Sequence, residues 1–308
     1  MIVQRTIRLK WILKIDGWNI LFYLAYGYLV CALNARSYFE NLTFPDAEIS
    51  VFGIAVAILL GFRNNEAYNR YWEARTAWGS LTNASRNFTS QVMGYVRYPN
   101  SQIPALQETI TNIHTEIIYR HLAFLNALRL QLRREETWQE LKPFLSDSEY
   151  QELSKAANKA AQLNHRQAQR LKELNMTGWI DEQAYIFGLM ESIKAFFAAQ
   201  GSCERIKTTP LPRQYGFFTK SFVWIFVLLL PLGLVQHLGW GTLPIYVILA
   251  SIFTITERIG QRTEEPFERK MEDVPMSAIC RNIEIDLKQQ LGESSIPAPL
   301  EPEGGVLM

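Results

Sequence analysis

The sequence has few of the residues that disulfide frameworks and metal sites require. Its 308 residues include 3 cysteines and 4 histidines, and no two cysteines form a Cys-x-x-Cys pair. This spacing excludes the common disulfide frameworks and zinc motifs, and it indicates free thiols in a reducing compartment. The cysteines are Cys31, Cys203 and Cys280.

Short catalytic motifs are absent as well. The chain has no Gly-x-Gly-x-x-Gly, no Walker-type phosphate loop, no His-Glu-x-x-His and no Gly-x-Ser-x-Gly. His114 and His121 lie seven residues apart on a predicted helix, where packing explains two histidines better than a metal pair does. We therefore expect no enzyme activity, no cofactor and no metal site.

An excess of charge of one sign is also missing. The chain carries 31 basic and 30 acidic residues, which gives a net charge of +1. No overall field would attract a nucleic acid or an acidic substrate, so nucleic acid is not expected as a partner. The apolar residues, 48% of the chain, are concentrated towards its two ends.

Apolar runs near both ends are candidates for membrane spans. The first covers residues 18–35 and has no cleavage site after it, so it reads as a retained span. Residues 217–238 and 240–259 form two more, separated by a tight turn at 239–241. Basic residues before the first span predict cytoplasmic N- and C-termini and an inner-membrane location, because the number of spans is even. These basic residues are Arg5, Arg8, Lys10 and Lys14.

Residues 49–79 form the remaining membrane segment, and the rest of the chain is organised around it. Its first half has no charged side chain, yet at roughly 14 residues it is shorter than the ~20 that a lipid-exposed span needs. A short apolar helix that continues directly into polar residues is typical of a pore lining. Ile54, Ile58 and Phe62 form a ridge on this helix that drifts by ~40° per step. Small residues beside the ridge favour close helix packing: Gly53, Ala55, Ala57 and Gly61.

The ridge and the charges after it have a plainer interpretation, because apolar residues at helical spacing usually form ordinary core. Glu66 and Glu73 are candidate charges of a vestibule, although Glu66 with Arg70 also forms an ordinary i,i+4 pair. Arg63 lies ~100° around the helix from Phe62. We therefore expect it to contact a neighbouring subunit or lipid headgroups.

The middle of the chain, from Tyr98 to Pro210, has no run that could span a membrane, and charges recur through it with helical periodicity. We expect helices at 106–134, 147–174 and 181–205, with loops at 100–104 and 142–143. The apolar face of the first helix is Ile110, Ile113, Ile117, His121, Phe124, Leu128 and Leu132.

Three ordered blocks resemble the bestrophin channel family, in particular its bacterial members. They are LGFRNNEAYNRYWEARTAWG at 60–79, GSCERI followed by TTPLP at 201–212, and EEPF followed by DVPM and AIC at 264–280. The resemblance implies five copies around one pore, with the triplet Ile54, Ile58 and Phe62 as a hydrophobic neck. It also implies a second, cytoplasmic constriction, for which Ala184 and Tyr185 are the candidates.

The resemblance further suggests conduction of monovalent cations, sodium above all. An anion channel of the same fold is the alternative, and a non-conducting membrane scaffold or sensor is a third hypothesis. The calcium clasp of animal bestrophins is not expected, because Glu268 replaces a glycine of the family pattern and Arg269 and Lys270 interrupt the acidic run. We interpret Glu264, Glu265, Glu272 and Asp273 as structural or as part of the vestibule.

The expected fold is therefore an all-α membrane protein, assembled as a homopentamer around a central pore in the lipid bilayer. Each subunit would have four transmembrane helices and a helical cytoplasmic region. The expected segments are residues 1–96 with the pore helix, 97–212 in the cytoplasm, 213–260 with the last two spans, 261–293 in the cytoplasm, and a mobile tail at 294–308.

Overall fold

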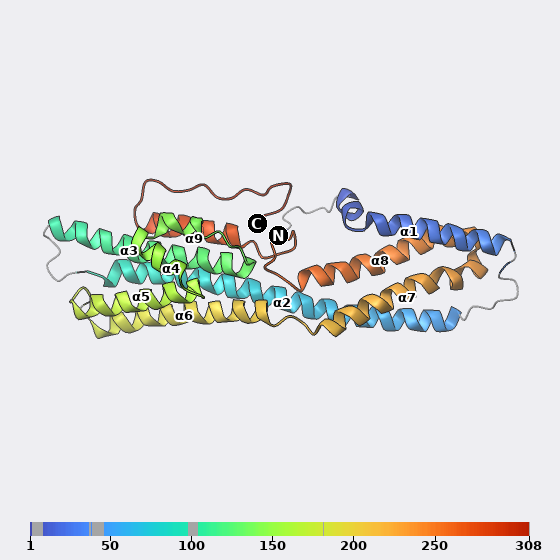
Figure 1. The fold of residues 1–308 in the computed structure, drawn as a ribbon, viewed down its shortest axis with the longest axis horizontal. Helices are drawn as coiled ribbons and strands as arrows, with labels where there is room; N and C mark the ends of the chain where they lie inside the picture. Colours follow the sequence, from blue (N-terminus) through green and yellow to red (C-terminus); the bar gives the residue numbers. More distant parts are fainter. Residues whose placement is uncertain (2–8, 37, 39–45, 98–103, 181, 308) are drawn as a thin grey trace. The chain divides into compact units, whose positions relative to one another are not determined.

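The structure is a computed structural model that describes residues 1, 9–36, 38, 46–97, 104–180 and 182–307 (Figure 1). These residues are mostly helical, and an isolated bridge between Glu303 and Val306 is their only β-pairing. The all-α expectation is thus confirmed. The helices are α1 (Leu9–Ala35), α2 (Asp46–Tyr95), α3 (Pro104–Arg133), η1 (Gln139–Phe144), α4 (Asp147–Ser154), α5 (Lys159–Met176), α6 (Gln183–Thr208), α7 (Arg213–Leu238), η2 (Gly239–Gly241), α8 (Thr242–Thr263) and α9 (Met276–Gln290).

The chain divides into two compact units, and α2 contributes to both. Unit 1 comprises Met1–Val3, Trp72–Thr209 and Pro266–Met308, and unit 2 comprises Gln4–Tyr71 and Pro210–Glu265. This division follows contacts within the chain and does not test where the chain enters or leaves the membrane. The expected boundaries between membrane and cytoplasmic segments therefore remain predictions.

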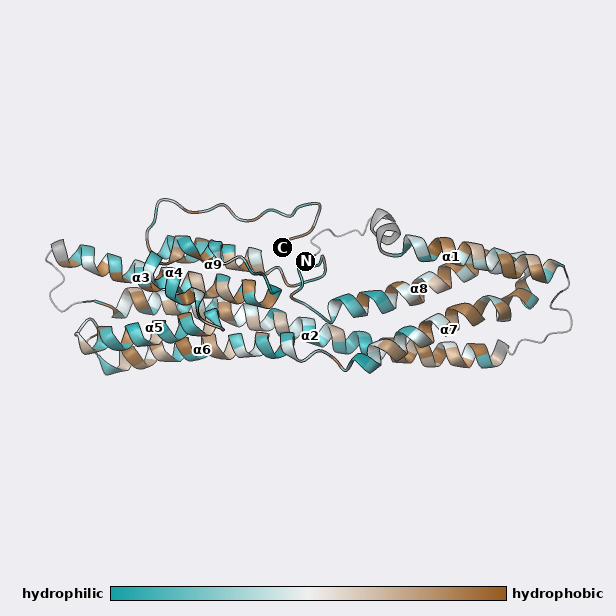
Figure 2. Ribbon diagram, in the orientation of Figure 1, coloured by the Kyte–Doolittle hydropathy of each residue, from teal (hydrophilic) through white to brown (hydrophobic). Residues whose placement is uncertain are grey.

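Unit 2 contains the apolar helices, which are mostly brown in Figure 2. In it α1 packs on α8, α7 packs on α8, and the core between them includes Tyr23, Val56, Val227 and Tyr246. Among the described residues, three segments are long and apolar enough to cross a membrane: Asp16–Ala35, Ala47–Tyr95 and Arg213–Thr263. The third segment contains both α7 and α8, so length and apolar composition do not confirm the expected four separate spans.

The turn expected between the last two apolar segments is present. Helix α7 ends at Leu238, and Gly239 follows with φ of 51°, a left-handed conformation that glycine adopts without steric cost. The three residues of η2 then lead directly into α8. Cys31 of α1 lies at this turn, with its thiol 3.6 Å from the carbonyl oxygen of Gly239.

Unit 1 is a helical bundle in which α3 packs on α5 and α9, and α5 packs on α6. The expectation of one helix over 147–174 is wrong, because the chain forms α4 and α5 there. Each helix has its own N-cap: Ser146 Oγ accepts the N–H of Glu149, and Asn158 Oδ1 accepts the N–H of Ala161. Helix α4 thus ends at Ser154, and Asn158 caps the start of α5 four residues later.

Two expected loops have different outcomes. The prediction of a loop at Lys142 and Pro143 is wrong, since both residues lie inside η1. Of the loop expected at 100–104, residues 100–103 lie outside the described part, and Pro104 is the first residue of α3, a position that tolerates a missing N–H. Asp181, the expected start of α6, is outside the described part as well.

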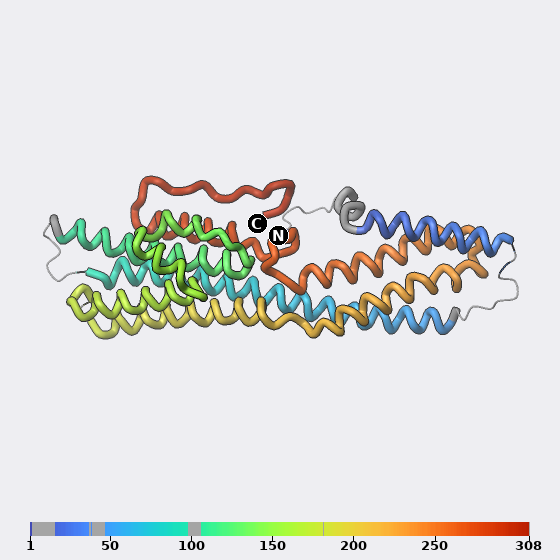
Figure 3. Tube along the Cα trace, in the orientation of Figure 1, coloured from blue at the N-terminus to red at the C-terminus, as the bar shows by residue number. Residues whose placement is uncertain are grey.

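The seven apolar-face positions of α3 are all buried, as predicted. The three cysteines are buried free thiols, which confirms that they form no disulfide. After α9, residues 291–307 run back along unit 1 as extended chain (Figure 3). The N–H of Leu307 donates to the carbonyl oxygen of Met1, and Arg281 donates to the carbonyl oxygen of Ala298. The mobility of this tail stays a prediction.

Candidate functional site

The first half of α2 has two faces of opposite character. One face packs inside unit 2 and includes Val56 and Leu60, which are 1% and 3% exposed. The predicted ridge lies on the other face, where Ile54, Ile58 and Phe62 are 62%, 53% and 69% exposed. Residues of a helix separated by about half a turn face opposite directions, so the ridge points away from the core of its own chain.

Close packing of glycine holds the inner face of α2 against its neighbours. A Cβ at Gly53 would lie 2.5 Å from the ring of Phe226 on α7. A Cβ at Gly260 of α8 would lie 1.9 Å from Asn64 Oδ1, and the amide of Asn64 donates to the carbonyl oxygen of Thr256 at 3.2 Å. A Cβ at either position would force the neighbouring side chain to move, so the two glycines permit the close approach of α2 to α7 and α8.

Arg63 fixes the rotation of α2, and the expectation for this residue was wrong. Its side chain is buried in unit 2, where Nη1 lies 2.9 Å from Glu257 Oε1 of α8 and Nη2 lies 3.5 Å from Glu264 Oε2. The side chain therefore pairs within its own chain rather than with a neighbour or a headgroup. Burial of a charge is tolerated here because two carboxylates surround it.

The candidate vestibule charges have different surroundings. Glu66 is exposed on α2, one helical step beyond Phe62. Glu73 forms an ion pair with Arg205 of α6, and both of these side chains are largely exposed. Arg205 belongs to the second block of the family resemblance and Glu73 to the first, so this pair connects the two blocks. Arg70 donates from Nε to the carbonyl oxygen of Glu264 at 3.1 Å.

The two candidates for the cytoplasmic constriction lie at the start of α6. Ala184 is exposed, whereas Tyr185 is half-buried. The ring of Tyr185 stacks on Tyr95 at the end of α2, with 4.3 Å between ring centroids and 3° between planes. Stacking holds the Tyr185 ring in one orientation.

The histidines of α3 are packing residues, as expected. His121 is buried, its Nε2 lies 2.8 Å from Ser85 Oγ, and its ring stacks on Phe196 at 4.2 Å. Burial lowers the pKa of His121 to about 3, so the ring is neutral. His114 Nε2 lies 2.7 Å from the carbonyl oxygen of Val96, and burial lowers its pKa as well.

Asp273 is a buried carboxylate of the segment that follows α8. It is 3% exposed, and its Oδ2 accepts the N–H of Lys270 at 2.9 Å. Burial raises the pKa of Asp273 to about 6. Within the described residues, no three His, Cys, Asp or Glu side chains form a group that could hold a metal ion.

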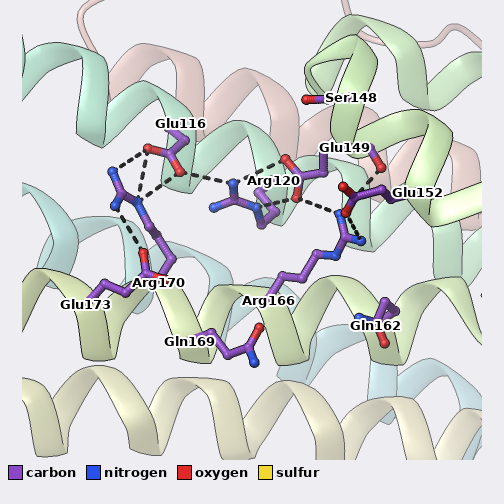
Figure 4. A pocket seen from close by; sticks show the side chains of 10 residues that line it. All are labelled: Glu116, Arg120, Ser148, Glu149, Glu152, Gln162, Arg166, Gln169, Arg170 and Glu173. Carbon is purple, nitrogen blue, oxygen red and sulfur yellow. Dashed lines mark hydrogen bonds and ion pairs between the residues drawn. The ribbon is translucent and has the colours of Figure 1, made fainter.

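An ion-pair ladder that sequence reasoning missed joins α3, α4 and α5 in unit 1 (Figure 4). Arg120 lies 2.6 Å from Glu149 and 3.0 Å from Glu116, and Arg170 lies 3.0 Å from Glu116. Arg166 extends the ladder to Glu152. Among the four contacts just given, only Glu116 with Arg120 has the i,i+4 spacing that a sequence can indicate. The other three join residues of different helices.

The ladder lines a pocket of about 490 Å³, and its chemistry is that of a structural network. Acidic and basic groups alternate along it, and each of its three arginines already contacts at least one carboxylate of the described residues. The ladder therefore stabilises the packing of three helices.

Comparison with known proteins gives a consistent result. The family described as Bacterial/Fungal Bestrophin protein matches residues 9–289. A voltage-dependent anion channel-forming protein of Mesorhizobium japonicum, mll4386, is 30% identical over 88% of this chain and 84% of its own length. YneE of Escherichia coli K12, which bears the same functional name, is 31% identical over 85% of this chain and 82% of its own.

Solved structures of bacterial bestrophin homologues have the same fold as this chain. The crystal structure of a bacterial bestrophin homologue from Klebsiella pneumoniae is similar with a TM-score of 0.81 and 24% identity, over 90% of this chain and 99% of that one. A single-residue variant of a Klebsiella homologue is similar at 26% identity with a TM-score of 0.79, over 89% and 100% of the two chains. The resemblance drawn from the three blocks is confirmed. The names of the relatives also agree with the expectation that the chain is not an enzyme.

Proposed function

Because this chain belongs to the bacterial and fungal bestrophin family, we propose that it forms a passive ion channel, with α2 as the lining of its pore. The observation that carries this proposal is the outward-facing ridge of Ile54, Ile58 and Phe62. The apolar half of α2 is too short to face lipid along its whole length, and it continues into polar residues without a helix break. Copies of the chain around an axis would cover the ridge.

We propose a homopentamer in the inner membrane, with four spans per subunit and both termini in the cytoplasm. Three rings of apolar side chains would then form a neck that offers nothing in place of an ion's hydration shell. Such a neck resists ions by expelling water, because an ion stripped of water without replacement is strongly disfavoured. Current would pass when the neck is wide enough to stay wet.

The sign of the conducted ion follows from charged groups beside the neck. Arg63 is buried and paired with Glu257, whereas Glu66 is exposed one step beyond Phe62. An exposed carboxylate without an exposed arginine beside the ridge favours cations, and we propose monovalent cations with sodium as the main one. Anion conduction is the second candidate, because the relatives mll4386 and YneE are named anion channel-forming proteins.

Purified protein in liposomes tests these proposals. In a gradient of sodium chloride, the reversal potential should lie near the sodium equilibrium potential. A reversal near the chloride potential would instead support the anion channel. Liposomes that contain folded, oligomeric protein and pass no current would overturn the channel proposal and favour a membrane scaffold. Mass measurement of the detergent-solubilised protein should give five copies.

A further inference from the structure

Unit 2 contains a polar pocket between α1, α7 and α8 that the channel proposal does not use. Its volume is about 270 Å³. Val223 and Trp224 form its apolar part, and the other lining residues are polar or charged. They are Asn19, Lys220, Thr254, Glu257, Arg258 and Gln261.

The charges beneath this pocket are already paired. Asp16, whose side chain is 0% exposed, accepts hydrogen bonds from Asn19 at 2.7 Å and Thr254 at 3.1 Å, and lies 3.5 Å from Arg258 Nη1. Glu257 is paired with Arg63 at 2.9 Å. Together these contacts satisfy both carboxylates inside the bundle, as burial requires.

Lys220 is the exception in this set. Its exposed ammonium group makes no ion pair or hydrogen bond with any residue that the structure describes. It lines the pocket together with Arg258, whose ion pair to Asp16 uses one of its terminal nitrogens. The pocket thus presents the unpaired ammonium group of Lys220, the guanidinium of Arg258 and the amide of Gln261 to a ligand.

The position of the pocket within unit 2 indicates where such a ligand comes from. The end of α1 meets η2, so the start of α1, the start of α7 and the end of α8 lie on the same side of this unit. The described residues at this side include Arg213, Lys220, Arg258 and Arg262 beside the paired acids Asp16 and Glu257. Basic residues at the end of apolar helices are typical of a face that meets an anionic leaflet. Beside the pocket, the Trp224 ring contacts Phe22 of α1 at 5.9 Å, and Phe22 is 41% exposed.

We propose that this pocket binds the phosphate of an anionic phospholipid, whose acyl chains lie on the exposed apolar surface beside Phe22 and Trp224. Lys220 and Arg258 would hold the phosphate oxygens, and Gln261 would donate a hydrogen bond. A free phosphate would use the same donors but would gain nothing from the apolar surface. This inference does not depend on the ion that the channel passes.

Native mass spectrometry of the detergent-purified full-length protein tests the proposal, with phosphatidylglycerol and phosphatidylcholine as probes. The parent protein should retain phosphatidylglycerol in preference to phosphatidylcholine. Lys220→Gln should weaken the retention of phosphatidylglycerol about fivefold, the effect expected of one basic residue at an anionic surface. Lys220→Arg should retain it. Lys194→Gln, which changes an exposed lysine of α6 in unit 1, serves as the matched control and should change nothing.

Gln261→Glu provides a second test at an exposed position, because it adds a negative charge without touching the core. It should weaken phosphatidylglycerol retention as well. Unchanged retention in both Lys220→Gln and Gln261→Glu would overturn the proposal, and so would equal retention of phosphatidylcholine. Binding of inorganic phosphate without retention of phosphatidylglycerol would show that the site takes free phosphate rather than lipid. A change in the number of subunits in Lys220→Gln, with lipid retention intact, would assign Lys220 to a subunit contact instead.

Discussion

The two units of this chain differ in where their large apolar side chains lie. Most of the exposed large apolar side chains of the described residues belong to unit 2, whereas unit 1 closes an apolar core around residues such as Leu122 and Phe124. Both units bury charged residues: Asp16, Arg63 and Glu257 in unit 2, and Arg120, Arg129 and Asp273 in unit 1. A large exposed apolar surface is typical of a unit that meets lipid or a partner subunit, so the difference supports the proposal that unit 2 lies in the membrane.

The largest expected effect comes from breaking the buried ion pair of unit 2. Arg63→Ala leaves Glu257 buried without its partner, which should lower the free energy of unfolding by about 3–5 kcal/mol. Thermal denaturation in detergent, followed by circular dichroism, measures this. Arg63→Lys keeps the charge and should lose less. Arg205→Ala removes the exposed ion pair with Glu73 and serves as the comparison. If Arg63→Ala lowered the free energy of unfolding by no more than Arg205→Ala does, burial would not make the Arg63 pair more important for stability.

Unit 1 buries two histidine rings, His114 and His121, and the contribution of His121 to stability depends on pH. His121 has its folded pKa lowered from 6.5 to about 3, so the unfolded chain binds the proton more tightly. The stability from this neutral ring is complete above about pH 6.5 and is lost as the pH falls towards 3. At pH 4 the loss should be on the order of 3 kcal/mol relative to pH 7. His121→Leu should flatten the stability profile over this range. An unchanged profile would show that His121 is not the group responsible.

Asp273 contributes with the opposite sign over part of the same range. Its pKa is raised from 3.8 to about 6, so its contribution is complete below about pH 4 and is lost as the pH rises through 6. The His121 effect is therefore best measured with Asp273 intact in both proteins, because its contribution then cancels.

The ion-pair ladder of Figure 4 contains both a buried and a partly exposed arginine, so it allows the effect of burial to be compared inside unit 1. Arg120 has an 11% exposed side chain and contacts Glu149 and Glu116, so Arg120→Ala should cost about 2–3 kcal/mol. Arg170→Ala removes a partly exposed partner of Glu116, with a side chain 32% exposed, and should cost less than about 1 kcal/mol. Denaturation midpoints of the two variants measure the difference. Equal losses would contradict the view that burial sets the strength of this ladder.

The last prediction concerns the outward face of α2, where the expected change affects ion flux rather than stability. Ile58→Ala shortens the middle ring of the proposed neck and should raise ion flux from liposomes about tenfold, equivalent to about 1.4 kcal/mol in the barrier, with little change in ion preference. Ile252→Ala on α8 is the matched control, because both isoleucines are 53% exposed. The control should leave the flux unchanged.

The neck assignment would be wrong if Ile58→Ala folded and assembled normally but conducted no more than the parent. Ile54→Ala and Phe62→Ala should behave in the same way as Ile58→Ala. If all three left the flux unchanged, the ridge would be an ordinary packing surface between subunits or towards lipid.

Much of the secondary structure could be predicted from the sequence, since local patterns determine it. The continuous helix through residues 49–79 and the turn at Gly239 were predicted and are present. The break between α4 and α5 was missed, because no proline or glycine marks it and the only local signal is Asn158, whose side chain caps the start of α5.

The sequence by itself determined that Ile54, Ile58 and Phe62 share one face of α2, because helix geometry relates positions four residues apart whatever surrounds them. Only the tertiary structure decided that this face points away from the core and that Arg63 points inwards. Arg63 meets Glu257 across 194 positions of the chain, and such an approach depends on how α2 packs against α8 at Gly260. Long-range pairs of this kind leave no periodic signal, because their partners are chosen by packing rather than by spacing.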